Sequence, residues 1–182
     1  CLPSIKFVSL IINEYKKEML NSLSKPVDLS NKKALISSRF TSTNYYDSIS
    51  FHRQFLLQNI KNNDLFITGR LPHKEYIEEC YSIYGLLSPF GWGEICYRDF
   101  EAIMCGNILL KPDMGHLITW PNIYADNCYL KLDWDFRNLD KICELFLERE
   151  NVLKYIENSR NIYFNAINDC STRAKKMILD QI

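Results

Sequence analysis

Residues 84–112 read YGLLSPFGWGEICYRDFEAIMCGNILLKP and change character three times along their length. Residues 84–88 are an apolar run that predicts a buried strand, and the loop after them is too rich in Pro and Gly for a helix or a strand. Residues 94–105 then show helical periodicity, which Gly106 closes as a natural helix C-cap. The apolar run 107–112 predicts a second strand. A strand, a helix and a strand in this order are typical of α/β proteins.

The helix predicted over residues 94–105 has two chemically different faces. One narrow stripe points away from the core and carries residues spaced i, i+4, i+7 and i+11: Glu94, Arg98, Glu101 and Cys105. The opposite face would pack into the core and carries Cys96, Phe100, Ile103 and Met104. A helix that starts after glycines offers free N–H groups to a phosphate, with which Arg98 could pair, and Glu101 could accept from sugar hydroxyls. A solvated face with an ordinary i,i+4 ion pair explains the same pattern equally well.

The same residues carry a family resemblance. The run Ser-Pro-x-Gly-x-Gly-Glu from Ser88, then Arg98, then Phe-Glu-Ala-x-x-Cys-Gly from Phe100, resembles the donor-binding signature of glycosyltransferases with the two-Rossmann-domain (GT-B) fold. More narrowly, it resembles the bacterial and viral family 1-type C-terminal domains. The resemblance implies that this loop and helix grip the diphosphate and ribose of a nucleotide sugar, with Glu101 on the ribose hydroxyls. It covers roughly residues 34–167 and is strongest over 84–112.

The spacing of the two glutamates departs from the family pattern. Many retaining members carry two glutamates with seven residues between them, whereas Glu94 and Glu101 have six between them (95 to 100). The position that would restore the spacing is Gly93. The role of the first glutamate therefore does not pass to Glu94, and the choice between retention and inversion of configuration stays open.

Charge and cysteine content narrow the class of protein. The 182 residues include 22 Lys and Arg against 22 Asp and Glu, and this balance argues against a nucleic-acid binder, which usually has a basic excess. The seven cysteines show no C-x-x-C spacing, so neither a disulfide framework nor a zinc site is indicated. We therefore expect a reducing, cytoplasmic location. No apolar run is long enough to predict a transmembrane segment.

Two further predicted strands end next to an arginine. Residues 34–39 and 64–70 contain short apolar runs that end in small residues followed by Arg39 and Arg70. Ligands of open α/β sheets bind just beyond the carboxyl ends of the strands, so both arginines are candidates to meet an anion. A surface-loop role is the plain alternative for Arg39.

The rest of the pattern predicts helices and one more strand. The strand is expected at residues 129–132. Helices are expected at 4–23, 51–61, 74–84, 139–148 and 152–167, although a strand at Ile5–Ile12 fits the first segment almost as well. This order predicts a doubly wound, mainly parallel α/β sheet with helices on both faces, which is a Rossmann-like fold.

We expect one Rossmann-like donor-binding domain over residues 1–182. It would have a leading helix and linker at 1–30, a core at 31–150 and C-terminal helices at 151–182. The chain begins at Cys1 rather than Met, and its length is about half that of a two-domain glycosyltransferase. By the resemblance, we expect a fragment of a longer protein whose N-terminal acceptor domain is missing.

Other nucleotide and metal motifs are missing from the sequence. There is no G-x-G-x-x-G turn, G-x-x-x-x-G-K-[ST] loop or G-x-S-x-G elbow, which disfavours nicotinamide or flavin enzymes, P-loop nucleotidases and α/β hydrolases. Asp133-Trp134-Asp135 matches a short metal-binding signature of a different glycosyltransferase fold. Between a strand and a helix Asp is also a good turn residue, and we favour that role. We expect no metal or other cofactor.

The sequence therefore predicts a glycosyltransferase that passes the sugar of a nucleotide-diphospho-sugar to an acceptor hydroxyl, as in glycan or polysaccharide synthesis, without a metal. The expected donor-binding residues are Gly91, Trp92, Gly93, Glu94, Arg98, Glu101, Arg39 and Arg70. The sequence identifies no catalytic base, and it specifies neither the donor nor the acceptor. Two alternatives stay open: a nucleotide-sugar or carbohydrate-binding domain with no transfer activity of its own, and a sugar-nucleotide epimerase on the same fold.

Overall fold

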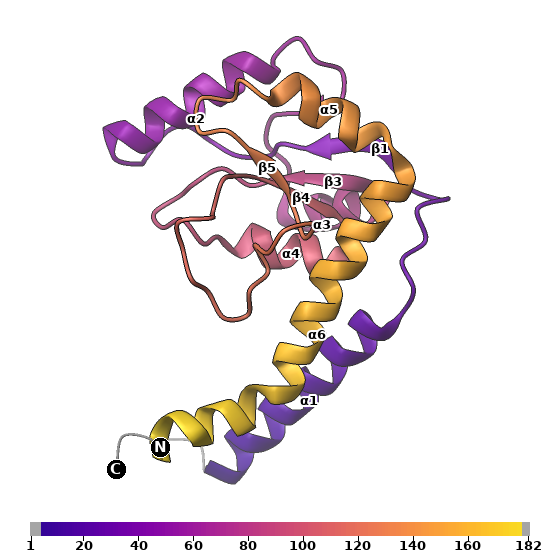
Figure 1. Ribbon diagram of the computed structural model, residues 1–182, viewed down its shortest axis with the longest axis vertical. Helices are drawn as coiled ribbons and strands as arrows, with labels where there is room; N and C mark the ends of the chain where they lie inside the picture. The colour runs from indigo at the N-terminus through magenta and orange to yellow at the C-terminus, as the bar shows by residue number, and fades with distance from the viewer. Residues whose placement is uncertain (1–4, 180–182) are drawn as a thin grey trace.

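The computed structural model describes residues 5–179, and its centre is a five-stranded sheet in which all strands are parallel (Figure 1). The strands lie in the order β2-β1-β3-β4-β5. They are β1 Lys33–Ser37, β2 Phe66–Ile67, β3 Ile83–Leu87, β4 Ile108–Pro112 and β5 Leu130–Leu132. With helices on both faces, this is the doubly wound α/β sheet that the sequence predicts. Cys1 and the expected helix start at residue 4 lie outside the described residues.

Both faces of the sheet are covered, which explains the continuous apolar character of its strands. All residues of β3 are buried, and neighbouring residues of a strand point to opposite faces. Accordingly, Leu86 belongs to one apolar cluster and Leu87 to the other. The same division separates Leu109 from Leu110 in β4.

The helices form a layer on each side of the sheet (Figure 1). They are α1 Ile5–Ser24, α2 Asp47–Ile60, α3 His73–Ser82, α4 Tyr97–Cys105, α5 Leu139–Leu147 and α6 Arg149–Leu179. α2, α5 and the start of α6 cover one face, whereas α3 and α4 cover the other. α6 takes part in both clusters, through Val152 and Ile156 in the first and through Ile162 and Tyr163 in the second. Within residues 5–179, none of the helices has the length and apolar character that a bilayer crossing needs.

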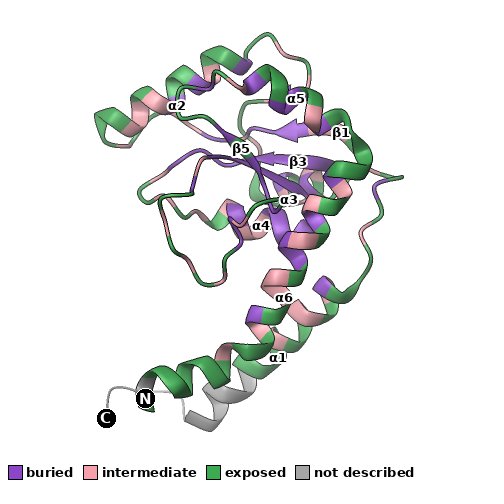
Figure 2. Cartoon of the chain, viewed as in Figure 1, coloured by how far each residue is buried: buried purple, intermediate pink, exposed green. Residues whose placement is uncertain are grey.

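The first and last helices form an antiparallel pair that extends away from the sheet (Figures 1 and 2). Lys16 Nζ donates to the carbonyl of Asn168 (3.0 Å) along the pair, and Arg160 Nη2 donates to the carbonyl of Ser22 (2.7 Å) near the sheet. Residues 12–15 and 171–177 in the outer part of the pair are exposed (Figure 2). The leading helix is therefore held to the rest of the domain mainly through α6.

Several boundaries differ from those that the sequence predicts. α2 begins at Asp47 rather than at residue 51, because the extended backbone of Tyr46 (φ −58°, ψ 152°) ends the loop there. β2 keeps only two residues, because it is the edge strand and pairs only with β1. α6 continues without a break to Leu179. The alternative strand at Ile5–Ile12 is wrong, since α1 is helical throughout.

A crevice is expected between β1 and β3, because the chain leaves these neighbouring strands in opposite directions. β1 leads to the edge strand β2, whereas β3 leads to β4. Ligands of open α/β sheets bind at such a switch point. The loops that follow the two strands, 38–46 and 88–96, are equal in length and lead into α2 and α4. Both loops begin with the sequence Ser-x-Phe, so the crevice has two matching walls.

Candidate functional site at the switch point

A cavity of about 850 Å³ lies at this crevice, lined by both loops and by residues of α2, α3 and α4. Its volume falls within the roughly 300–1,000 Å³ that small-molecule sites occupy. The cavity is lined by most of the residues that are expected to bind the donor. These are Arg39, Arg70, Gly91, Trp92, Gly93, Arg98 and Glu101. Glu94 does not. The structure thus brings together seven of the eight expected residues around one cavity.

Glu94 lies outside the cavity because the helix starts later than the sequence predicts. α4 begins at Tyr97, so Glu94 belongs to the preceding loop and shares no helical stripe with Arg98. Its carboxylate is hydrogen-bonded to His116 Nε2 (2.7 Å), and both side chains are partly exposed. Cys105, expected at the other end of the outward stripe, is buried. The predicted stripe is therefore wrong at both ends.

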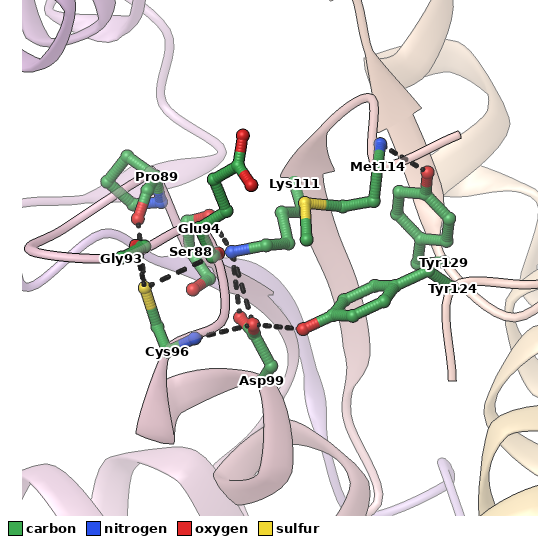
Figure 3. Close-up of polar contacts among 10 residues, drawn as sticks. All are labelled: Ser88, Pro89, Gly93, Glu94, Cys96, Asp99, Lys111, Met114, Tyr124 and Tyr129. Carbon is green, nitrogen blue, oxygen red and sulfur yellow. Dashed lines mark hydrogen bonds and ion pairs between the residues drawn. The ribbon is translucent and has the colours of Figure 1, made fainter. Parts of the chain in front are cut away.

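The start of α4 holds a buried carboxylate of its own, that of Asp99 (Figure 3). Asp99 accepts hydrogen bonds from the backbone N–H of Cys96 (2.9 Å) and the hydroxyl of Tyr124 (2.6 Å), and it pairs with Lys111 (3.1 Å). Lys111 also donates to the carbonyl of Ser88 (3.4 Å), so the network ties both ends of the glycine loop to β4. The Asp99 carboxylate offsets the positive dipole at the N-terminus of α4. The positive charge of the cavity therefore comes from its arginine side chains.

Tyr76 orients the carboxylate of Glu101 at the cavity. The hydroxyl of Tyr76 donates to Glu101 Oε2 at 2.7 Å, and burial raises the pKa of Tyr76, so the hydroxyl keeps its proton. Arg98 Nε contacts the same hydroxyl at 3.4 Å, but Glu101 forms no ion pair among residues 5–179. A carboxylate that is held in place without a neutralising cation can accept hydrogen bonds from ligand hydroxyls.

The expected arginines differ in how far their charge is already neutralised. Arg39 forms an ion pair with Glu79 through Nε and Nη2 (Nη2–Oε2 2.6 Å). Burial alone would raise the pKa of Glu79, but the hydrogen bonds from Arg39 lower it, so the pair stays charged at neutral pH. Arg98 Nη2 donates only to a backbone carbonyl, that of Arg39 (2.8 Å). Arg70 is exposed. Arg39 therefore has the least charge to offer a ligand.

Arg53, which no sequence motif marks as a site residue, is the most buried arginine of the cavity. It lies in the second turn of α2, and its guanidinium carbon lies 4.2 Å from the ring centroid of Tyr45 and 5.3 Å from that of Phe40. Nε and Nη1 have no hydrogen-bond partner. Burial lowers the pKa of Arg53. Both loops begin with Ser-x-Phe, and this shared sequence is the signal that indicates α2 as the counterpart of α4.

Trp92 and Tyr45 line the cavity and form an aromatic cluster with the exposed Tyr46. Trp92 is 70% exposed, and its ring centroid lies 5.6 Å from that of Tyr45 and 5.2 Å from that of Tyr46. The two tyrosines come from loop 38–46 and the tryptophan from loop 88–96, so this cluster joins the two walls. An exposed aromatic face of this kind can stack on a nucleobase or a sugar ring.

The Asp-x-Asp run has the contacts of a turn. Asp135 pairs with Arg137 (2.5 Å), and the backbone N–H of Asp133 donates to Asn138 Oδ1 (2.9 Å) just before α5. Across the part of the chain that the structure describes, no cluster of three or more His, Cys, Asp or Glu side chains is arranged to hold a metal ion.

Chemically, the cavity combines cations suited to a polyanion, a carboxylate suited to hydroxyl groups and aromatic rings suited to stacking. All three lie at the carboxyl ends of β1 and β3. No protein-family model matches the chain, and no curated protein matches it in sequence.

Proposed function

We propose that this domain binds a nucleotide-diphospho-sugar and transfers the sugar to an acceptor hydroxyl. The observation that carries the proposal is the position of Glu101, a carboxylate oriented by Tyr76 in a cavity that four arginines also line. A nucleotide sugar needs both features, because cations bind its diphosphate and a carboxylate accepts from its ribose hydroxyls. The resemblance of residues 88–106 to a donor-binding signature supports the same assignment.

The proposal gives each part of the cavity a task. Gly91 and Gly93 let the loop backbone approach the diphosphate, and Arg98 and Arg70 supply positive charge. As the bond from the anomeric carbon to the phosphate oxygen breaks, these cations stabilise the departing nucleoside diphosphate. In this proposal they take the place of a metal ion. Trp92 offers a ring on which the base or the sugar stacks.

The first test is calorimetric titration of the chain with UDP, GDP and their sugars. We expect one nucleotide to bind, and we expect Glu101→Gln and Arg98→Gln each to weaken that binding by about tenfold or more, as loss of a charged hydrogen bond does. Glu94→Gln is the matched control, since Glu94 lies on the same loop–helix segment but outside the cavity. A folded protein that binds none of these nucleotides would contradict the proposal.

Two further measurements separate the roles. If Glu101 binds the ribose, a 2′,3′-dideoxy nucleotide should bind the wild type and Glu101→Gln with the same affinity. Release of nucleoside diphosphate from the bound donor, with and without a hydroxyl acceptor, then tests transfer. Binding without turnover would favour the alternative, a nucleotide-sugar-binding domain with no transfer activity of its own.

A further inference from the structure

Arg53 carries an uncompensated charge inside the protein. Its side chain is 4% exposed, Nε and Nη1 lack partners, and no acidic side chain forms an ion pair with it among residues 5–179. Removing a charge from water is strongly unfavourable unless a partner compensates it, and buried polar groups in native proteins are almost always paired. An unpaired guanidinium at the wall of a cavity therefore points to a partner that is not part of the chain.

The surroundings of Arg53 fix its position, and Tyr45 partly stabilises its charge, but no carboxylate among the described residues forms an ion pair with it. The rings of Phe40 and Tyr45 hold the guanidinium, which reduces the conformational entropy lost when a ligand binds. Arg98 lines the same cavity, and its positive charge adds to the unfavourable environment of Arg53. Two like charges at one cavity repel each other until an anion lies between them.

Two other cations nearby already have a carboxylate partner. Arg39 pairs with Glu79, and Lys111 pairs with Asp99. Arg53 comes from α2 on one wall of the crevice, and Arg98 comes from α4 on the other. An anion between them would therefore contact both layers of helices at once.

We infer that Arg53 and Arg98 form an anion subsite that bridges the two walls of the crevice and takes a doubly charged phosphate-type group, with Arg53 as its main anchor. The planar guanidinium presents parallel N–H groups that match two phosphate oxygens, and two such groups balance a dianion. The inference rests on the proposed function for the identity of the complete ligand. The subsite itself would bind its anion whether or not the domain transfers a sugar.

The test uses inorganic pyrophosphate as the probe, followed by calorimetry and by the thermal midpoint of unfolding, Tm. Pyrophosphate should bind the wild type and raise its Tm, and it should bind Arg53→Met at least tenfold more weakly. Arg137→Met is the matched control, because Arg137 is exposed and does not line the cavity, and it should bind pyrophosphate like the wild type. Unchanged pyrophosphate affinity in Arg53→Met would overturn the inference.

The stability of the unliganded variant gives a second readout. If Arg53 mainly stabilises the fold, its replacement in Arg53→Met removes stabilising contacts and should lower the Tm. An arginine held uncompensated for a ligand should leave the Tm equal or raise it, because the substitution removes a buried unpaired charge and keeps the side-chain length. A lower Tm together with wild-type pyrophosphate binding is the pattern of a structural residue.

A second variant covers the case in which Arg53→Met does not fold. Arg53→Lys keeps the charge but loses the planar fork, and we expect several-fold weaker pyrophosphate binding; equal affinity would overturn the inference. The outcomes also separate the two proposals. Pyrophosphate binding through Arg53 without binding of any UDP or GDP sugar would support the subsite and reject the proposed donor.

Discussion

The ammonium group of Lys111 lies 3.1 Å from a carboxylate oxygen of Asp99, and both side chains are fully buried. Lys111 belongs to β4 and Asp99 to the first turn of α4, so the pair joins the sheet to the helix that carries Arg98 and Glu101. Neither member lines the cavity. The pair therefore fixes a wall of the site without contacting what the site would bind.

Breaking this pair should be costly for the fold. Lys111→Met leaves the Asp99 carboxylate buried without its cation, and we expect a loss of about 3–5 kcal/mol in the free energy of unfolding. Urea denaturation measures this free energy of unfolding. Lys131→Met is the control, because Lys131 is 43% exposed and its contacts with carboxylates are 3.6 Å long, so the loss should stay within about 1 kcal/mol. Similar losses in the two variants would contradict this account of the buried pair.

Two glycines should differ in how well they tolerate a methyl group. A Cβ at Gly85 in β3 would lie 2.6 Å from Phe146 and 2.7 Å from Ile36, both in the packed core. Gly85→Ala should therefore cost about 1–3 kcal/mol of stability through overpacking. A Cβ at Gly93 would meet nothing closer than 3.9 Å, so Gly93→Ala should fold like the wild type. Thermal unfolding measures the stability of both variants. A Gly85→Ala variant as stable as the wild type would show that the core has room to shift.

His52 should make stability depend on pH. Burial lowers the pKa of His52, while the hydrogen bond from Nε2 to the Trp134 carbonyl (2.8 Å) acts in the opposite direction. Nδ1 is buried without a partner, so a proton there would be unfavourable in the folded state. The unfolded chain binds the proton near the ordinary pKa of about 6.5, and stability should therefore fall as the pH drops through this value.

The variant that isolates this effect is His52→Phe, which keeps an aromatic ring between Phe90 and Phe136. The difference in unfolding free energy between about pH 8 and about pH 5 should be smaller in the variant than in the wild type. The remaining ionisable groups are common to both proteins. Equal pH dependence in the two would remove His52 as the cause.

Arg160 should control the attachment of α1. Its Nη2 donates to the carbonyls of Ser22 (2.7 Å), Leu23 (3.1 Å) and Lys25 (3.1 Å), and its Nη1 donates to that of Ile103 (3.1 Å). Arg160→Met should cost on the order of 3 kcal/mol, because charged hydrogen bonds to buried carbonyls are lost. Hydrogen exchange should rise first in residues 12–24. Uniform exchange across the whole domain would instead mean that α1 has no separate opening.

The order of the elements could be predicted because its signals are local. The apolar run 108–110 and the αL glycine Gly106 (φ 66°) mark a helix end and a buried strand within a few residues. Likewise, Arg98 and Glu101 could be assigned to one site because the motif that contains them is nearly continuous in sequence. Their placement at one cavity follows from the geometry of a single loop and helix.

The errors at the site come from contacts between distant parts of the chain or from an unusual helix start. Cys96 is not a common N-cap residue, so the sequence pattern places the start of the helix too early, at Glu94. The burial of Arg53 depends on how α2 packs against the loop after β1, and periodicity alone does not show that. Glu79 neutralises Arg39 across 40 positions of sequence, which no local pattern indicates.

The antiparallel pairing of α1 and α6 also determines how the protein would bear a mechanical load. The outer ends of the two helices lie at the same tip, away from the sheet (Figure 1). A pulling force applied there would act across the pair and separate it one contact at a time, beginning beyond Lys16 and Asn168. Separation would stop at Arg160, which holds the last turn of α1. The sheet and its cavity would feel no tension until that arginine releases.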